Sequence, residues 1–351
     1  MSAADPSPPA RPASPPDPTI AAAEARPKGH LTVLDGWRGI SIALVLAAHL
    51  LPLGPKPWEL NEATARMGMA IFFTLSGFLI TRLLLADTRI TDFLIRRVLR
   101  IVPLAWLAMA IAFPLTDAAA NTYLPNFLFY ANLPPIRLTA VASHLWSLCV
   151  EMQFYLAIAM VVLLAGARGL VFMPLLGLAV TLLRVRDGAY LDIVTWHRID
   201  EILAGVTLAL ISGERLGQAA VRLVSRCNVY WLVPLAAVTC HPDATFMNYL
   251  RPYAVALMVG STLYAPPAAA RALLSSRVLK YLAAISFALY VIHGVLMETW
   301  LGSGDRLVKY AKRPLLFALT FALAHVSTFH YEARWIALGK GLTARRRGAG
   351  R

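Results

Sequence analysis

Long apolar segments recur along most of this 351-residue chain, and short polar connectors separate them. Their lengths suit bilayer-crossing α-helices, which need about 20 residues, and they lack the alternating ten-residue pattern of barrel strands. Lipid offers no partner to open backbone groups, so such segments must form internally bonded helices. Hydrophobic residues make up 58% of the chain and charged residues only 15%, unlike an ordinary soluble domain. The sequence therefore predicts an all-α, polytopic membrane protein.

The apolar segments predict about ten transmembrane helices around a central cavity. Two of them, 199–212 and 229–241, are short for a full crossing, so we expect some helices to be tilted or broken around that cavity. The predicted spans are 34–51, 68–85, 100–116, 144–166, 169–183, 199–212, 229–241, 253–268, 278–300 and 314–331.

The formal net charge of +14 does not indicate a nucleic-acid partner, because the basic residues gather at the ends of apolar segments. Connectors rich in arginine face the cytoplasm, which places 82–100, 213–228 and the C-terminal tail there. Both termini are then cytoplasmic, provided that the short apolar stretch 123–133 does not cross. If that stretch crosses, the orientation of the following segments inverts. The basic segment 305–313 falls outside and is the one misfit.

The sequence predicts three regions. Residues 1–30 are rich in proline and alanine and should form a disordered cytoplasmic tail. Residues 31–338 form the transmembrane domain, and residues 339–351 form a basic cytoplasmic tail. The three cysteines have no metal-binding spacing, so we expect no metal site.

Arg38 and His49 belong to the first apolar segment. Eleven residues of helix rise about 16 Å, roughly half the hydrocarbon thickness of a bilayer. We therefore expect Arg38 at the cytoplasmic start of the span and His49 in the membrane interior. An imidazole there is a candidate functional group, although it can also serve as a hydrogen bond between helices.

Five segments, in order, resemble the motifs of the acyltransferase-3 family. The resemblance covers residues 31 to about 338 and implies an integral-membrane enzyme of the bacterial inner membrane. Such enzymes move an acyl group, commonly acetyl, from cytoplasmic acyl-CoA to a hydroxyl of a cell-surface or exported glycan. The segments are 34–49, 71–80, 93–103, 144–155 and 285–293.

The resemblance assigns His49 as the general base, a role worth roughly 10²- to 10⁴-fold in rate. Arg38, Arg97 and Arg100 match the family's arginines and are candidates for binding acyl-CoA, because guanidinium groups bind phosphate bidentately. The alternative is that these arginines only anchor the helices at lipid phosphates.

Ser76 and Glu151 have two interpretations each. Ser76, followed by Gly77, suits close helix packing, and a nucleophilic role is the alternative. Glu151 could orient or charge His49, or it could charge the start of its own helix. The family's usual second acid is replaced here by Met152.

The candidates for the acceptor site or the cavity wall are Trp146, Ser76, His293, Arg198 and Asp200. His293 could instead bond Ser286 or Tyr290 within its own helix. Arg198 and Asp200 follow the family's Arg-x-Asp pattern and should face outward, where an ordinary interfacial belt is the alternative.

Two other functions remain open at this point. Relatives also acylate small secondary metabolites such as macrolides, so the acceptor need not be a glycan. A non-catalytic transporter or flippase would have a similar multi-span architecture. The expected partners are therefore acyl-CoA, one of these acceptors and the lipid bilayer.

Overall fold

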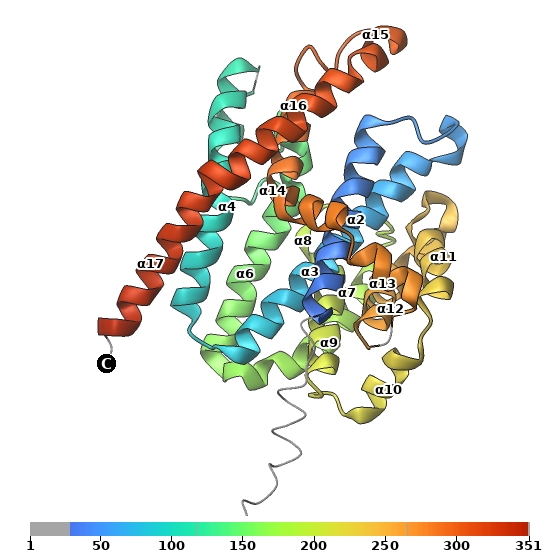
Figure 1. The fold of residues 1–351 in the computed structure, drawn as a ribbon, viewed down its shortest axis with the longest axis vertical. Coiled ribbons are helices and arrows are strands. Elements are labelled where there is room, and N and C mark those ends of the chain that lie inside the picture. Colours follow the sequence, from blue (N-terminus) through green and yellow to red (C-terminus); the bar gives the residue numbers. More distant parts are fainter. Residues whose placement is uncertain (1–28, 117, 265, 350–351) are drawn as a thin grey trace, which may run out of the picture.

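The computed structural model describes residues 29–116, 118–264 and 266–349, which form helices and connecting loops without a β-strand (Figure 1). The predicted all-α class is confirmed. Of the predicted N-terminal tail, residues 1–28 lie outside the described residues. The longer helices are α2 (Gly29–Leu50), α3 (Leu60–Ala86), α4 (Ile90–Ala112), α6 (Trp146–Ala165), α7 (Met173–Arg186), α9 (Asp200–Ser212), α11 (Val229–Cys240), α12 (Arg251–Tyr264), α14 (Arg277–Met297), α16 (Arg313–Val326) and α17 (Ala333–Ala349).

Short helices connect these elements. Among them, α5 spans five residues of the apolar stretch 123–133, which is therefore too short to cross a bilayer. The short helices are η1 (Lys56–Trp58), η2 (Phe113–Leu115), η3 (Ala120–Thr122), α5 (Tyr123–Phe127), η4 (Ala140–Leu145), η5 (Gly166–Phe172), α8 (Thr195–Arg198), α10 (Gln218–Arg226), η6 (Pro242–Leu250), α13 (Ala268–Leu274), α15 (Arg306–Ala311) and η7 (Ser327–Glu332).

Six helical segments of the described residues are long and apolar enough to cross a membrane, instead of the predicted ten. A seventh is possible if α10 and α11, which meet at an 88° bend, form one broken span. The predicted spans 144–166 and 169–183 correspond to α6 and α7, which are counted within one segment although Gly166, at φ 62°, ends α6 before η5 and α7. The six segments are Thr32–Leu50, Lys56–Ala86, Ile90–Leu115, Ala140–Arg186, Arg277–Met297 and Arg313–Gly348.

The predicted spans 199–212 and 253–268 correspond to α9 and α12, which have 13 and 14 residues and are short for a bilayer. Most of their side chains are buried against other helices, including Val206 and Val255, which are fully covered. A helix that is apolar all round can be surrounded by protein as well as by lipid. Hydropathy alone does not separate these two environments.

Helices α3 and α9 are in backbone contact. A Cβ atom added to Gly77 would lie 1.9 Å from the carbonyl oxygen of Ile202, and one added to Gly205 would lie 2.0 Å from that of Thr74. Glycine at both positions therefore allows this approach. The contact fixes the position of Ser76, which precedes Gly77 in α3.

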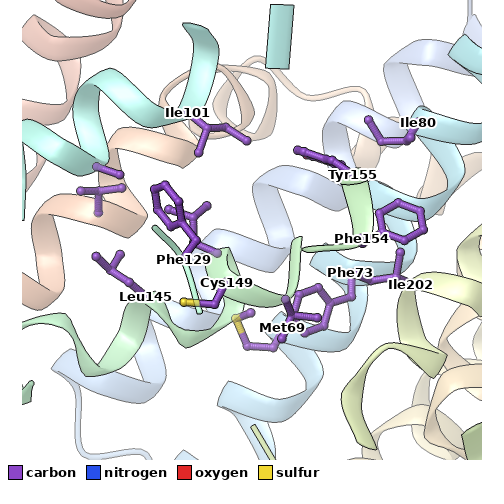
Figure 2. Close-up of a cluster of buried hydrophobic side chains, with 14 of the residues drawn as sticks. Met69, Phe73, Ile80, Ile101, Phe129, Leu145, Cys149, Phe154, Tyr155 and Ile202 are labelled. Atoms are coloured by element: carbon purple, nitrogen blue, oxygen red, sulfur yellow. The ribbon is translucent and has the colours of Figure 1, made fainter. Parts of the chain in front are cut away.

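A hydrophobic core links α3, α4, α6 and α9, and Figure 2 shows part of it. Phe73, Ile80 and Phe154 are almost fully buried in this core. It holds α6 between α3 and α4, which positions Glu151 and Tyr155 of α6 beside the arginines of α4. The side chains labelled in the view are Met69, Phe73, Ile80, Ile101, Phe129, Leu145, Cys149, Phe154, Tyr155 and Ile202.

The arginine-rich connectors lie at one end of the bundle, and the basic helix α15 (Arg306–Ala311) lies at the other. The α3–α4 connector, α10 and the C-terminal end of α17 lie at one end, which we call the basic end (Figure 1). The loop after α2 and helix α15 lie at the opposite end. Helix α2 runs between the two, so its early and late residues reach different ends of the molecule.

Candidate functional site

A cavity of about 480 Å³ opens at the basic end. Seven basic side chains and two carboxylates line it, together with a few apolar residues. A concave surface with such an excess of positive charge suits a ligand with several phosphate groups. The charged lining residues are Arg82, Asp87, Arg89, Asp92, Arg96, Arg97, Arg100, Lys340 and Arg347.

Arg97 and Arg100 also line a smaller inner cavity of about 70 Å³. The two arginines thus lie at the boundary between the cavities. The inner wall includes Arg38 of α2 and Glu151 of α6, whose charges are opposite. Helices α2 and α4 therefore bring together the three arginines predicted for the donor site, Arg38, Arg97 and Arg100.

Glu151 is buried, and two hydroxyl groups donate to its Oε1 atom. One is the hydroxyl of Ser76, and the other is that of Tyr155 at 2.5 Å. These bonds tie α6 to α3 beside the inner cavity. Among the described residues, the structure does not join Glu151 to His49. A buried carboxylate next to three arginines balances their charge, because unpaired ions of one sign are costly in a low-dielectric site.

His49 lies at the C-terminal end of α2. Helix α2 begins at Gly29, so Arg38 lies well inside it, and His49 is its penultimate residue, with an exposed side chain. The structure thus places His49 at a helix end and not in mid-helix, and the depth of Arg38 and His49 in a membrane stays a prediction.

The hydrogen-bond partner of His49 is His293 of α14. Nδ1 of His49 is 3.0 Å from Nε2 of His293, and the two rings stack with their centroids 5.2 Å apart. Nδ1 of His293 is in turn 3.1 Å from the carbonyl oxygen of Leu289. The structure thus gives His293 partners other than Ser286 and Tyr290.

These contacts determine the tautomers of a neutral pair. A carbonyl oxygen only accepts, so Nδ1 of His293 carries the proton and Nε2 accepts. The proton between the rings then belongs to Nδ1 of His49, which leaves Nε2 of His49 unprotonated. A base that accepts a proton through Nε2, with its other nitrogen held by a hydrogen bond, is the usual arrangement of a catalytic histidine.

His144 and Tyr290 surround this pair; from the sequence, Tyr290 was expected only as a partner of His293, and His144 was not singled out. The ring of His144 lies 5.3 Å from that of His293, and the ring of Tyr290 lies 5.7 Å from it. The Tyr290 hydroxyl bonds the hydroxyl of Ser147 at 2.6 Å and donates to the carbonyl oxygen of His144. Tyr290 also lines the inner cavity, so it connects that cavity with the histidines.

Close packing brings His144 to α14. A Cβ atom added to Gly294 would lie 2.2 Å from Nδ1 of His144, so the glycine makes room for the ring. The signal for His144 in the sequence is its position at the start of the fourth motif, two residues before Trp146.

Arg198 and Asp200 are buried inside the bundle instead of forming an interfacial belt, and each has a charged partner. Asp200 pairs with Arg184 at 2.5 Å, and Arg198 lies 3.4 Å from Glu201. Glu201 also pairs with Arg251 at 2.6 Å. The five side chains form an ion-pair network that links α7, α8, α9 and α12. Charged residues inside apolar segments are the sequence signal for Arg184, Glu201 and Arg251.

Trp146 lies next to this network. The guanidinium group of Arg198 is 5.3 Å from the Trp146 ring and 5.9 Å from the Phe73 ring. The two rings pack edge to face with centroids 5.7 Å apart. Trp146 therefore supports a buried cation by cation–π contact.

His197 lies between two carboxylates in the connector after α7. Its Nδ1 is 2.6 Å from Asp192, and its Nε2 is 3.0 Å from Asp187. Both ring nitrogens must donate to satisfy both contacts, which only the protonated ring can do. Burial lowers the pKa of His197, but the hydrogen bonds to Asp192 and Asp187 outweigh burial and hold the pKa above its usual value.

We expect the connector 187–197 to loosen as pH rises. A histidine whose pKa is raised by folding adds stability below its unfolded pKa of about 6.5, and this stability is lost as pH rises through the folded pKa. Amide exchange of residues 187–197, corrected for its intrinsic pH dependence, should therefore be faster at about pH 9 than at about pH 6. His197→Gln should remove this difference, and an equal difference in both proteins would contradict the expectation.

Comparisons with known proteins identify similar sequences. A sequence model described as an acyltransferase domain matches residues 31–329. The chain is 29% identical over 150 residues to the peptidoglycan O-acetyltransferase OatA of Listeria monocytogenes, a match that covers 35% of this chain and 22% of that protein. It is 28% identical over 162 residues to nodulation protein 10 of Rhizobium leguminosarum bv. viciae, covering 38% and 44%. The chain thus spans less than half the length of these relatives. No solved structure matches it.

Proposed function

This chain belongs to the acyltransferase-3 family, and on this basis we propose that it is a membrane O-acyltransferase with an acyl-CoA donor. The acyl group is acetyl, and the acceptor is a hydroxyl of a cell-surface or exported glycan. One relative is a peptidoglycan O-acetyltransferase, and its name supports this acceptor class. The enzyme works in the bacterial inner membrane with the basic end in the cytoplasm.

The donor binds at the basic end. Its phosphate groups lie in the 480 Å³ cavity, near Arg97 and Arg100, and its thioester arm enters the inner cavity beside Arg38. The inner cavity has room for only a few water molecules. Entry of the arm therefore displaces lining side chains, and Phe287 and Tyr290 lie on that path.

The reaction takes place near His49. Nε2 of His49 removes the proton of the acceptor hydroxyl as its oxygen attacks the thioester carbonyl. The new C–O bond forms, the C–S bond breaks, and the CoA sulfur leaves with the proton that His49 has accepted. His293 holds the His49 ring in the required tautomer. Both histidines lie farther from the basic end than Tyr290 does. The acceptor therefore approaches from the end of the bundle opposite to the basic end.

One observation carries this proposal. The tautomer that the Leu289–His293–His49 contacts require leaves Nε2 of His49 as a base, on the same helix that brings Arg38 to the inner cavity.

The proposal is tested by comparing glycans and metabolites, by mass spectrometry, from cells with and without the gene. We expect an acyl mass increment on a glycan fraction only when the gene is present. Purified protein should also release CoA thiol from acetyl-CoA in the presence of that glycan. Substrate-dependent flux across vesicles without CoA release would support a transporter and contradict the proposal. An acyl mass increment found only on a small metabolite would contradict a glycan acceptor and identify that metabolite as the acceptor.

Replacing Arg100 by methionine should raise the KM for acetyl-CoA by about 10- to 100-fold, because a charge-assisted hydrogen bond to phosphate contributes about 1.5–3 kcal/mol. We expect a smaller effect on kcat, since Arg100 lies away from the histidines. Initial rates of CoA release measure both constants. The control is Arg277→Met, an exposed arginine at the start of α14 that neither cavity lining includes. Equal KM values for the two variants would argue against a donor role.

A further inference from the structure

The C-terminal helix α17 forms one wall of the basic cavity. Ile336, Lys340 and Arg347 of α17 line the cavity together with residues of α3, α4 and their connector. Helix α17 begins at Ala333, beyond residue 329, where the family match ends. Part of this cavity wall therefore comes from a segment outside the matched domain.

Helix α17 is held along α4 in an antiparallel orientation (Figure 1). Just before α17, the hydroxyl of Tyr331 donates to the carbonyl oxygen of Pro103 at 3.2 Å. Two turns nearer the start of α4, Arg96 donates to the hydroxyl of Thr343 at 2.9 and 3.1 Å. At the end, Arg347 donates to Asp92 at 3.0 Å. These contacts follow the whole length of the cavity wall.

Arg347 changes the charge that the cavity presents. Its guanidinium bonds both carboxylates of the lining, Asp92 at 3.0 Å and Asp87 at 3.1 Å. Arg89 contacts the same two carboxylates, at 2.7 Å for Asp87 and 3.9 Å for Asp92. Without Arg347, these acids would repel a phosphate group more strongly. Lys340, which is exposed, adds an ammonium group with three donors to the same wall.

We propose that α17 is part of the phosphate-binding site, in which Lys340 binds a phosphate group of the donor and Arg347 neutralises Asp87 and Asp92. The assignment rests on the proposed function, since it takes the donor to be acyl-CoA. An anionic lipid headgroup carries the same chemistry and reaches the same end of a membrane protein. The experiment therefore separates the two sources of phosphate.

The full chain is reconstituted in nanodiscs of phosphatidylcholine, and binding of coenzyme A is measured by titration calorimetry. Lys340→Met and Arg347→Gln should each weaken the Kd by about five- to tenfold, with a larger effect at low salt. Asp92→Asn added to Arg347→Gln should restore part of the loss, because it removes a negative charge that the first change leaves without its closer cationic partner. The matched control is Arg345→Met, an exposed arginine of the same helix that the cavity lining does not include.

The outcomes separate this inference from the proposed function. If the unchanged protein binds coenzyme A and all variants bind it as tightly as the Arg345→Met control, the role of α17 is overturned while the donor assignment stands. If the unchanged protein binds no coenzyme A, the proposed function itself fails. If phosphatidylglycerol in the nanodisc binds in a Lys340-dependent manner and coenzyme A does not, the site belongs to a lipid headgroup and the donor role of α17 is overturned.

Discussion

Replacing His49 by alanine should lower the rate of acyl transfer by about 10²- to 10⁴-fold, the contribution typical of a general base. The change removes the ring whose Nε2 accepts the proton and leaves Nε2 of His293 without its partner. Cells that contain equal membrane amounts of each protein are compared by the acyl content of their isolated glycans. Because His49 is exposed at the end of α2, the variant should reach the membrane at a normal level.

The matched control is His330→Ala, an exposed histidine of η7 near the C-terminal helix. It should transfer acyl groups at the unchanged rate. His293→Ala tests the hydrogen bond separately. We expect an intermediate rate, since the His49 ring remains but its tautomer is no longer fixed. Unchanged acylation by His49→Ala at a normal protein level would refute the role of this residue.

Replacing Gly77 by alanine should have the largest effect on stability. The added Cβ would lie 1.9 Å from the carbonyl oxygen of Ile202, which is backbone of α9 and cannot rotate away. The two helices must then separate, at a cost of at least the roughly 1–3 kcal/mol seen for overpacked cores. Thermal unfolding in detergent, followed by fluorescence-detected size exclusion, should show a lower midpoint and less monodisperse protein.

Gly341→Ala is the control for this prediction. Gly341 also lies within a helix, but a Cβ there meets nothing within 4 Å, and alanine favours helix over glycine by up to about 1 kcal/mol. Its unfolding midpoint should stay the same or rise slightly. Equal midpoints for the two variants would mean that α3 and α9 can separate without cost, and that the contact does not fix Ser76.

The sequence predicts the helical class and the family, because apolar periodicity and short motifs are local properties. Of the ten predicted spans, those at α9 and α12 are too short to be candidate spans, and their apolar side chains are buried inside the protein. The position of His49 within its helix also depends on where α2 begins and ends. Helix boundaries are set by single residues that hydropathy averages over.

The contacts of the site residues could not be predicted, because they join distant parts of the chain. Glu151 bonds Ser76 from another motif, although an imidazole partner was the natural expectation for a buried carboxylate. Arg198 and Asp200 were expected on the outward side, as part of an acceptor site or an interfacial belt, and their ion-pair partners, Arg184 and Glu201, could not be predicted. Only the three-dimensional packing of α7, α9 and α12 determines this pairing.

The bond between His49 and His293 joins residues 244 positions apart, which has a consequence for biogenesis. At synthesis rates of about 5 to 20 residues per second, roughly 12 to 50 seconds separate the two histidines as they leave the ribosome. During this interval the first span is in the membrane, but His49 lacks its partner His293 because α14 has not yet been made. The nascent chain therefore needs water, lipid headgroups or the insertion machinery to solvate His49 until the last third of the protein arrives.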